Sequence, residues 1–294
     1  MASIDGRAAW WLAIRPATLS ASAAPVLVGT GVAWSEGMFA AGPALAALLG
    51  AALLQVGANL ANDVFDFERG ADDADRLGPP RATHQGWVSP EQMKGAMWGV
   101  FACSALVGLY LTSVAGWPVL LLGLLSIAAA YLYTGGPRPY GYVGLGDLAV
   151  FVFFGPAAVV GTAYVQSLTL SPLALLASIP VGALATTILV VNNLRDIETD
   201  ARAGKNTLAV RLGERATRHY FVLLLALAYA LPPLLWWSDL TGPWVMLSWL
   251  SLPLALKVAQ RVRTQTGLPL NGCLVRTARL EVVYAILFAA GLAL

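Results

Sequence analysis

The stretch NLANDVFDFERGADDADRLGPPR, residues 59–81, joins the end of a long apolar run to a polar segment rich in aspartate. Within it, Asn59, Asp63 and Asp66 occupy positions i, i+4 and i+7. Residues with this spacing share one face of an α-helix. The stretch therefore predicts an apolar helix whose last turns carry one amide and two carboxylates on the same side.

A second stretch, NNLRDIETDARAGKNT at 192–207, repeats this arrangement near the C-terminal half of the chain. It also follows an apolar run, and it places Asn192, Asp196 and Asp200 at i, i+4 and i+8. The same helical periodicity brings these three side chains to one face. The sequence thus predicts two apolar helices with matching acidic ends.

The remainder of the chain has the composition of a membrane protein. Of the 294 residues, 58% are hydrophobic and 12% are charged, which is more apolar surface than a soluble domain can bury. Nine stretches approach the ~20 apolar residues needed to cross a bilayer. We expect an all-α, polytopic membrane protein, with nine transmembrane helices packed as a single domain over residues 1–294. The predicted spans are 16–34, 41–62, 92–113, 117–134, 145–166, 172–193, 218–237, 243–259 and 277–293.

The distribution of charge predicts the orientation of the chain. If the chain weaves through these nine spans, all 18 Lys and Arg residues fall on one side, and Glu36 and Asp239 are the only charges on the other. Positively charged loops remain cytoplasmic. We therefore expect a multi-pass protein of the cell's inner (plasma) membrane, with a cytoplasmic N-terminus and a C-terminus on the opposite side. The basic residues near Arg215 are typical of a membrane-surface anchor, so nucleic acid is not an expected partner.

The acidic helix ends indicate a metal site. Carboxylates that converge in a partly dehydrated site repel one another by several kcal/mol unless a cation lies between them. The two cysteines, Cys103 and Cys273, form no thiolate cluster for a metal, and the two histidines cannot by themselves build a zinc site. Oxygen ligands select a hard ion, and Mg²⁺ keeps water ligands and bridges to phosphate. Mg²⁺ is the predicted cofactor.

Cations beside the acidic ends indicate a phosphate-bearing ligand. Arg76, Arg81, Arg195, Arg202 and Lys205 are placed to bind the phosphate oxygens that the metal leaves. A diphosphate held at the mouth of an apolar bundle suits a molecule with a lipid tail. Neutralising such a leaving group allows an allylic carbon–oxygen bond to ionise, and the carbocation then needs an anhydrous pocket.

Aromatic residues near the same helix ends could shield that cation with their ring faces. Ordinary packing is the alternative role for each of them taken singly. The candidates are Tyr131, Tyr133, Tyr140, Tyr142, Phe151, Phe153 and Phe154.

These motifs resemble those of the UbiA superfamily of intramembrane prenyltransferases, and the resemblance covers nearly the whole chain. Its paired Asp-rich motifs look like NDVFD at 62–66 and DIETD at 196–200. The branch that prenylates 1,4-dihydroxy-2-naphthoate, the MenA type, is more similar still. The matching segments are RPATL at 15–19, PVLVGT at 25–30, NLANDVFDFERGAD at 59–72, DRLGPPR at 75–81, YTGGPRPYGYVGLGD at 133–147 and NNLRDIETDARAGKNTLAVRLG at 192–213.

The resemblance implies a nine-helix fold and a specific reaction. A polyprenyl diphosphate ionises, the naphthoate ring carbon that bears the carboxylate attacks, and CO₂ is lost, in menaquinone or phylloquinone biosynthesis. The implied Mg²⁺ ligands are Asp63, Asp66, Asp196 and Asp200, and the predicted catalytic residues are these four and Asp147. Many superfamily members have a further Asp where this chain has Gly70, and Asp72 or Asp73 is expected to substitute for it.

Other residues take binding roles in this interpretation. Asp147 would orient or deprotonate the aromatic hydroxyl, although an interfacial helix N-cap is an equal alternative. Amides would orient carboxylates and waters, and cations would hold the diphosphate or the acceptor carboxylate. The expected substrate-binding residues are Asn59, Asn62, Arg76, Arg81, Tyr133, Arg138, Tyr140, Asn192, Asn193, Arg195 and Lys205.

Several alternatives remain open from the sequence. The acceptor follows from the resemblance alone, and 4-hydroxybenzoate or homogentisate would leave the same motifs. An ion-coupled transporter also places acids in a membrane bundle, but near the bilayer centre rather than at helix ends. A CDP-alcohol phosphotransferase also uses Mg²⁺ and Asp, but in one continuous motif that this chain lacks. A structural membrane protein gives no reason for two acidic faces.

Overall fold

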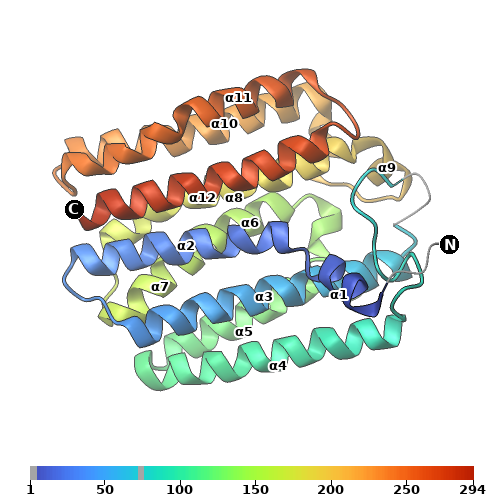
Figure 1. Cartoon of the computed structure of the whole chain (residues 1–294), viewed down its shortest axis with the longest axis horizontal. Helices are drawn as coiled ribbons and strands as arrows, with labels where there is room; N and C mark the ends of the chain where they lie inside the picture. Colours follow the sequence, from blue (N-terminus) through green and yellow to red (C-terminus); the bar gives the residue numbers. More distant parts are fainter. Residues whose placement is uncertain (1–4, 72–75) are drawn as a thin grey trace.

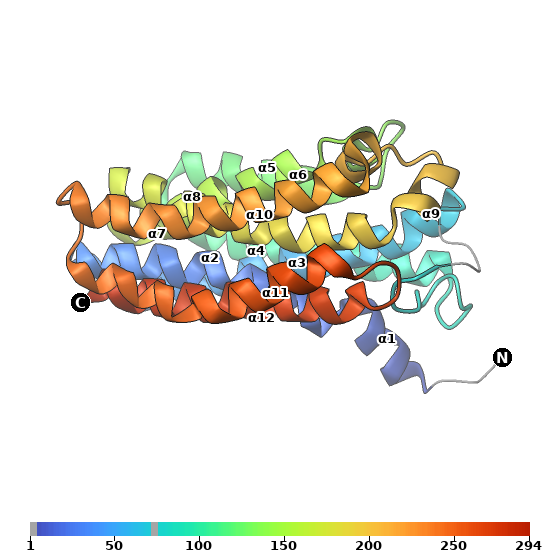
Figure 2. The ribbon, with the colours of Figure 1, turned by 90° about the horizontal axis from the view of Figure 1, so that it is seen from above.

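The computed structural model describes residues 5–71 and 76–294, and within these ranges every regular element is helical. The long helices run side by side along one direction and form a single bundle (Figure 1). Viewed at 90°, the same helices remain aligned, while α1 diverges from the bundle at one end (Figure 2). The prediction of an all-α protein is confirmed.

The elements follow the order of the predicted spans, with several short additions. In chain order they are α1 (Gly6–Ile14), α2 (Pro16–Ser35), α3 (Ala41–Glu68), α4 (Pro90–Ala115), α5 (Trp117–Leu132), η1 (Tyr140–Val143), α6 (Gly146–Val152), η2 (Phe153–Ala157), α7 (Ala158–Ser167), α8 (Pro172–Arg195), α9 (Ile197–Arg202), α10 (Leu208–Trp237), η3 (Pro243–Ser251), α11 (Leu252–Thr264) and α12 (Leu270–Ala293).

Each of the nine predicted spans coincides with a helix or with consecutive helices, but fewer meet the length and hydropathy expected of a membrane span. Among the described residues, five do so: α3, α4, the continuous stretch Gly146–Ser167, α8 and α10. The pair α1 and α2, bent by 44°, adds a sixth. The 16 residues of α5 form a shorter apolar helix. The number nine is therefore not established by length and composition.

Small residues allow the central helices to pack closely. A Cβ added to Gly31 of α2 would lie 2.9 Å from the carbonyl oxygen of Ala289 in α12. Gly155 and Gly182 meet in the same way, since a Cβ on Gly182 would lie 3.1 Å from the Cα of Gly155. Helices that touch through glycine approach more closely than side chains otherwise permit. The largest buried cluster lies among α2, α7, α8, α10, η3, α11 and α12.

Two irregular features, absent from the sequence interpretation, shape the interior. The helical conformation is interrupted between α1 and α2 at Arg15, which has a φ of 54°. Helix α6 passes into the π-helical turn η2, which contains Pro156. Proline lacks the N–H that an α-helix requires, and a π-turn accommodates it by changing the direction of the side chains.

The polar segments gather at one end of the bundle. The C-terminal ends of α3 and α8, together with α1 and α9, lie there, whereas the C-terminus of the chain lies at the other end (Figure 1). Both acidic helix ends predicted from the sequence are therefore at the same end of the fold.

Candidate active site

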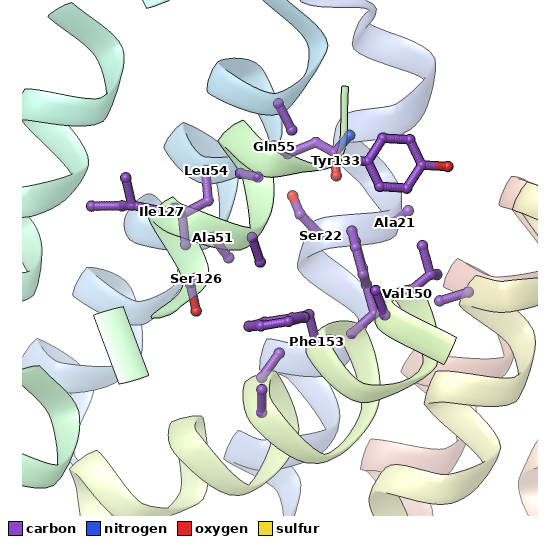
Figure 3. Close-up of a pocket in the computed structure, with 18 of the residues that line it drawn as sticks. Ala21, Ser22, Ala51, Leu54, Gln55, Ser126, Ile127, Tyr133, Val150 and Phe153 are labelled. Carbon is purple, nitrogen blue, oxygen red and sulfur yellow. The ribbon is translucent and has the colours of Figure 1, made fainter. Parts of the chain in front are cut away.

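A cavity of 540 Å³ extends from the polar end of the bundle into its apolar interior. Its inner walls come from α2, α3, α4, α5 and the α6–α7 segment. Figure 3 shows side chains of α2, α3, α5 and α6 around one space, with Tyr133 and Phe153 among them. The polar end is lined by Arg15, Thr18, Asn62, Asp66, Arg76, Arg81, Tyr133, Tyr140, Asn192, Asn193, Asp196, Thr199, Asp200 and Lys205.

The depth of the cavity can be read along α3. Its lining residues on this helix run from Ala47 to Asp66. At 1.5 Å per residue, that separation corresponds to about 28 Å. The walls over this length are mostly Ala, Val, Leu, Gly and Phe. The cavity is thus long, narrow and apolar, with its charges confined to one end.

Asp66 is the carboxylate of the first acidic end that lines this cavity. It is buried, and both of its oxygens are engaged: Oδ1 accepts a hydrogen bond from the Tyr142 hydroxyl at 2.8 Å, and Oδ2 accepts one from Arg81 at 2.9 Å. Charge-assisted hydrogen bonds of this length are strong and directional. Asp66 is therefore held in one orientation by two different segments.

Asp63 points to a different environment. Its two oxygens accept hydrogen bonds from the backbone N–H groups of Ala82 and Thr83, at 3.1 and 2.9 Å, and the residue is only 1% exposed. It does not line the cavity. Asp63 instead fastens the loop after α3 to the body of the protein.

Asn59 does not line the cavity either. Its amide nitrogen donates to the Ile14 carbonyl at 2.8 Å and to the Thr18 hydroxyl at 3.0 Å, and its oxygen accepts from Gln55. These contacts join the last residue of α1 to the first turn of α2. Asn59 therefore positions the start of α2.

The sequence predicted that Asp63 shares the cavity-facing side of α3 with Asp66. In the structure, Asn62 lies on the cavity wall instead. Side chains on a helix are separated by about 100° per residue, so Asn62 lies about 40° from Asp66, and Asp63 about 60° from it in the opposite sense. The cavity lies on the Asn62 side, where the Asn62 amide oxygen accepts a hydrogen bond from Thr134 at 3.0 Å.

The second acidic end brings Asp196 and Asp200 to the cavity. Arg195 binds both oxygens of Asp196, at 2.7 and 2.5 Å, and also donates to Asn192 and Asn271. Arg195 itself does not line the cavity. By binding Asn192 of α8 and Asn271 of α12 as well, Arg195 holds the Asp196 carboxylate in one position.

Asp200 has a looser ion pair, with Lys205 at 3.8 Å. Burial raises the pKa of Asp200 to about 6, against the attraction of Lys205 and with the repulsion of Asp196 and Asp66. Burial also raises the pKa of Tyr140. Asp200 is a carboxylate whose negative charge is incompletely compensated by the protein, as expected of a group that binds a cation.

Of the predicted site residues, eleven line the cavity and five do not. The eleven are Asn62, Asp66, Arg76, Arg81, Tyr133, Tyr140, Asn192, Asn193, Asp196, Asp200 and Lys205. Asn59, Asp63 and Arg195 lie behind the wall and hold its parts together. Arg138 is exposed on the 133–145 loop, away from the lining. Asp72 and Asp73 lie outside the described residues.

Asp147 lies behind the cavity wall. It is 4% exposed and sits in the first turn of α6, and its Oδ2 atom has no hydrogen-bond partner among the described residues. The neighbouring Gly146 packs against the Tyr133 hydroxyl, where an added Cβ would lie 3.1 Å away. Asp147 is thus next to a cavity-lining tyrosine without itself contacting the cavity.

Comparison with known proteins assigns this site to a family. The profile of the UbiA prenyltransferase family matches residues 22–269. This chain belongs to the UbiA prenyltransferase family. The resemblance predicted from the two Asp-rich motifs is therefore confirmed.

Curated relatives match the chain over most of its length. A 1,4-dihydroxy-2-naphthoate octaprenyltransferase of Mycobacterium tuberculosis is 45% identical over 260 residues, covering 88% of each chain. An enzyme of the same name from Escherichia coli is 42% identical and covers 97% of this chain and 94% of its own.

Solved structures of the UbiA family share the fold. A UbiA homolog from Aeropyrum pernix K1, in its apo form, superposes with a TM-score of 0.71 at 18% identity and covers 95% of this chain and 97% of its own. A UbiA homolog from Archaeoglobus fulgidus bound to GPP and Mg²⁺ gives a TM-score of 0.67 at 17% identity, covering 97% of this chain and 100% of its own. The bundle is thus a UbiA fold.

The chemistry of the donors fits a hard divalent ion. The cavity mouth offers oxygens from Asn62, Asp66, Asp196 and Asp200, the ligands that Mg²⁺ prefers. Within the described residues, no three His, Cys, Asp or Glu side chains lie close enough to hold an ion by themselves. The arrangement therefore fits ions that are shared between a few protein oxygens and a bound ligand.

Some residues of the site were missed by the sequence interpretation. Gln55 and Thr18 line the cavity, and Asn271 donates to the Leu77 carbonyl at 2.8 Å while it accepts from Arg195. Gln55 precedes Asn59 by one helical turn, so the same periodicity could have identified it. Asn271 lies far from both motifs in the sequence, and no local pattern indicates it.

Proposed function

We propose that this protein transfers a polyprenyl group from polyprenyl diphosphate to 1,4-dihydroxy-2-naphthoate, with loss of CO₂ and release of diphosphate, in menaquinone or phylloquinone biosynthesis. The observation that carries the proposal is the cavity, whose polar mouth joins both acidic helix ends to a long apolar interior. The names of the 45% and 42% identical relatives support this acceptor.

The mouth of the cavity would bind the diphosphate. Asp66, Asp196 and Asp200, with the Asn62 amide oxygen, are the proposed contacts to Mg²⁺, and Arg76, Arg81 and Lys205 are the proposed contacts to phosphate oxygens. The Archaeoglobus fulgidus homolog was solved with GPP and Mg²⁺. Bound Mg²⁺ would neutralise charge on the diphosphate as it leaves.

Asp63 was predicted as a further metal ligand, and this role stays a prediction. Its two bonds to the backbone of residues 82 and 83 favour a supporting role. By holding this segment, Asp63 keeps Arg81 against Asp66. We infer that it acts on the site through Arg81.

The apolar interior would hold the prenyl chain and keep water from the reacting carbon. When the carbon–oxygen bond of the prenyl diphosphate breaks, its electron pair leaves with the diphosphate and the chain carries an allylic cation. Tyr133, Tyr140, Phe153 and Phe154 line the cavity and can offer ring faces to this charge. A dry wall also prevents capture of the cation by water.

The acceptor would enter between the diphosphate and these aromatic rings. A ring carbon of the naphthoate forms the new carbon–carbon bond, and the carboxylate then leaves as CO₂, which restores the aromatic ring. Asp147 does not line the cavity, and its Oδ2 atom has no hydrogen-bond partner among the described residues. Its action on an acceptor hydroxyl stays a prediction.

The placement in the membrane follows the charge pattern. We propose nine membrane-crossing helices in the inner (plasma) membrane, with the polar end of the bundle in the cytoplasm. The segregation of all Lys and Arg residues supports this orientation. The N-terminus would then be cytoplasmic, and the C-terminus would lie on the opposite side.

Product formation in detergent tests the proposal. The purified protein is given geranylgeranyl diphosphate and either 1,4-dihydroxy-2-naphthoate or 4-hydroxybenzoate, with Mg²⁺ or with EDTA. We expect a demethylmenaquinone-type product and CO₂ only from the naphthoate, lost in EDTA and restored by excess Mg²⁺. Product from the benzoate alone would refute the acceptor, and no product over a range of prenyl chain lengths would refute the reaction.

A further inference from the structure

Tyr142 contacts the first acidic end of the site and the segment that follows the second, although it lies on neither of the helices that carry the acidic residues. It belongs to the 3₁₀ turn η1, in the loop between α5 and α6. Its hydroxyl donates to Asp66 Oδ1 at 2.8 Å. Its carbonyl accepts the backbone N–H of Asn206 at 3.0 Å. A single residue therefore bridges the end of α3 and the segment that follows α9.

The ring of Tyr142 adds a second kind of contact. Lys205 Nζ lies over the ring, 5.2 Å from its centroid, and Arg69 Cζ lies 5.7 Å from it. A cation over a ring face is attracted by the electron-rich face of the π-system. Because Lys205 also lines the cavity, the ring helps to fix a cation at the mouth.

We propose that Tyr142 is a positioning residue that couples the two acidic ends. Its hydroxyl orients Asp66 for the metal, and its ring and carbonyl hold Lys205 and Asn206 at the cavity mouth. This inference rests on the proposed function, since it assigns Asp66 to the metal and Lys205 to the diphosphate.

The hydroxyl and the ring make separable contributions. Asp66 has two oxygens, and Arg81 binds Oδ2 while Tyr142 binds Oδ1. A donor behind a metal-binding carboxylate fixes its orientation, and loss of such a donor typically lowers metal affinity or activity about 10- to 100-fold. The hydrogen bond to Asp66 is made by the hydroxyl and not by the ring. The ring instead contacts Lys205, so its removal should affect binding of the diphosphate.

Two substitutions separate these contributions. Tyr142→Phe removes the hydroxyl and keeps the ring. We expect the Kd for Mn²⁺, measured by electron paramagnetic resonance with inorganic diphosphate present, to rise about tenfold. The KM for geranylgeranyl diphosphate at saturating Mg²⁺ should change less than about twofold. Tyr142→Leu removes both the hydroxyl and the ring. We expect its KM for geranylgeranyl diphosphate to be about fivefold higher than that of Tyr142→Phe.

A double substitution tests whether the effect passes through Asp66. In Asp66→Asn protein, adding Tyr142→Phe should not weaken Mn²⁺ binding further, because residues that act on one group are not additive. An additive loss would overturn the coupling. Tyr110→Phe is the matched control, since Tyr110 is exposed on α4 and lies outside the cavity lining. It should behave as wild type.

The outcomes discriminate the inference from the proposed function. Mn²⁺ binding is measured without an acceptor, so a wrong acceptor leaves the test valid. Wild-type Mn²⁺ affinity in Tyr142→Phe would overturn the role of the hydroxyl. An identical KM for the diphosphate in the Phe and Leu variants would overturn the role of the ring. Size-exclusion profiles and hydrogen exchange of residues 133–145 establish that the variants are folded.

Discussion

The Asp63→Asn substitution tests whether this carboxylate acts on the loop or on the metal. In the structure, Asp63 accepts two backbone N–H groups, from Ala82 and Thr83, inside a site that excludes water. Asparagine keeps one acceptor oxygen, but it turns an NH₂ group toward the second N–H. One charge-assisted hydrogen bond is lost, and the backbone N–H and the new NH₂ group face each other without an acceptor, at a cost of about 2–4 kcal/mol.

This cost should appear as local opening of the loop rather than as global unfolding. At 1.4 kcal/mol per tenfold, 2–4 kcal/mol corresponds to a roughly 30- to 700-fold larger open population. Hydrogen–deuterium exchange followed by mass spectrometry, on peptides that cover 76–88, measures this population. We expect much faster exchange there, accompanied by loss of prenyl transfer, because Arg81 is released from Asp66.

Asp200→Asn is the matched control for this experiment. Its side chain contacts Lys205 rather than the 82–83 backbone, so activity should fall while exchange over 76–88 remains as in the wild type. The reasoning fails if Asp63→Asn leaves exchange over 76–88 unchanged. Loss of Mn²⁺ binding without faster exchange would instead identify Asp63 as a direct metal ligand.

Two further substitutions test the assignment of charges at the mouth. Asp196→Asn should abolish turnover and preserve the elution profile of the folded protein, because Arg195 keeps its bonds to Asn192 and Asn271; normal turnover would remove Asp196 from the metal site. Arg138→Ala should keep kcat/KM within about twofold of wild type, because Arg138 is exposed and does not line the cavity. A larger loss would show that Arg138 takes part in substrate binding.

The fold could be predicted largely because its signals are local. Each predicted apolar run coincides with a helix or with consecutive helices of the described residues, and the spacing of Asn and Asp predicted that two helices end in acidic faces. Both acidic ends do meet at one cavity, through Asp66, Asp196 and Asp200. The apolar runs could not predict where the helices are interrupted. The π-turn around Pro156 and the positive φ at Arg15 depend on neighbouring helices that accept an irregular backbone.

The detailed roles depended on tertiary contacts. In NDVFD, Asn62 and Asp63 are adjacent in sequence, and helical spacing alone placed Asp63 on the same face as Asp66. The rotation of α3 within the bundle decided that Asn62 faces the cavity. The bonds of Asp66 to Arg81 and Tyr142 span 15 and 76 residues. No periodicity reports contacts of that kind.

The short helix α5 has a consequence for the surrounding lipid. At 1.5 Å per residue, 16 residues span about 24 Å, whereas the hydrocarbon core of a bilayer is about 30 Å thick. Trp117 at the start of α5 is exposed, and aromatic residues prefer the interface. In the nine-helix topology proposed above, a bilayer that met both ends of this helix would be thinner there, at a cost of fractions of a kcal/mol per Å. Since α5 forms one wall of the cavity, that topology would concentrate the hydrophobic mismatch beside the space proposed for a lipid-tailed substrate.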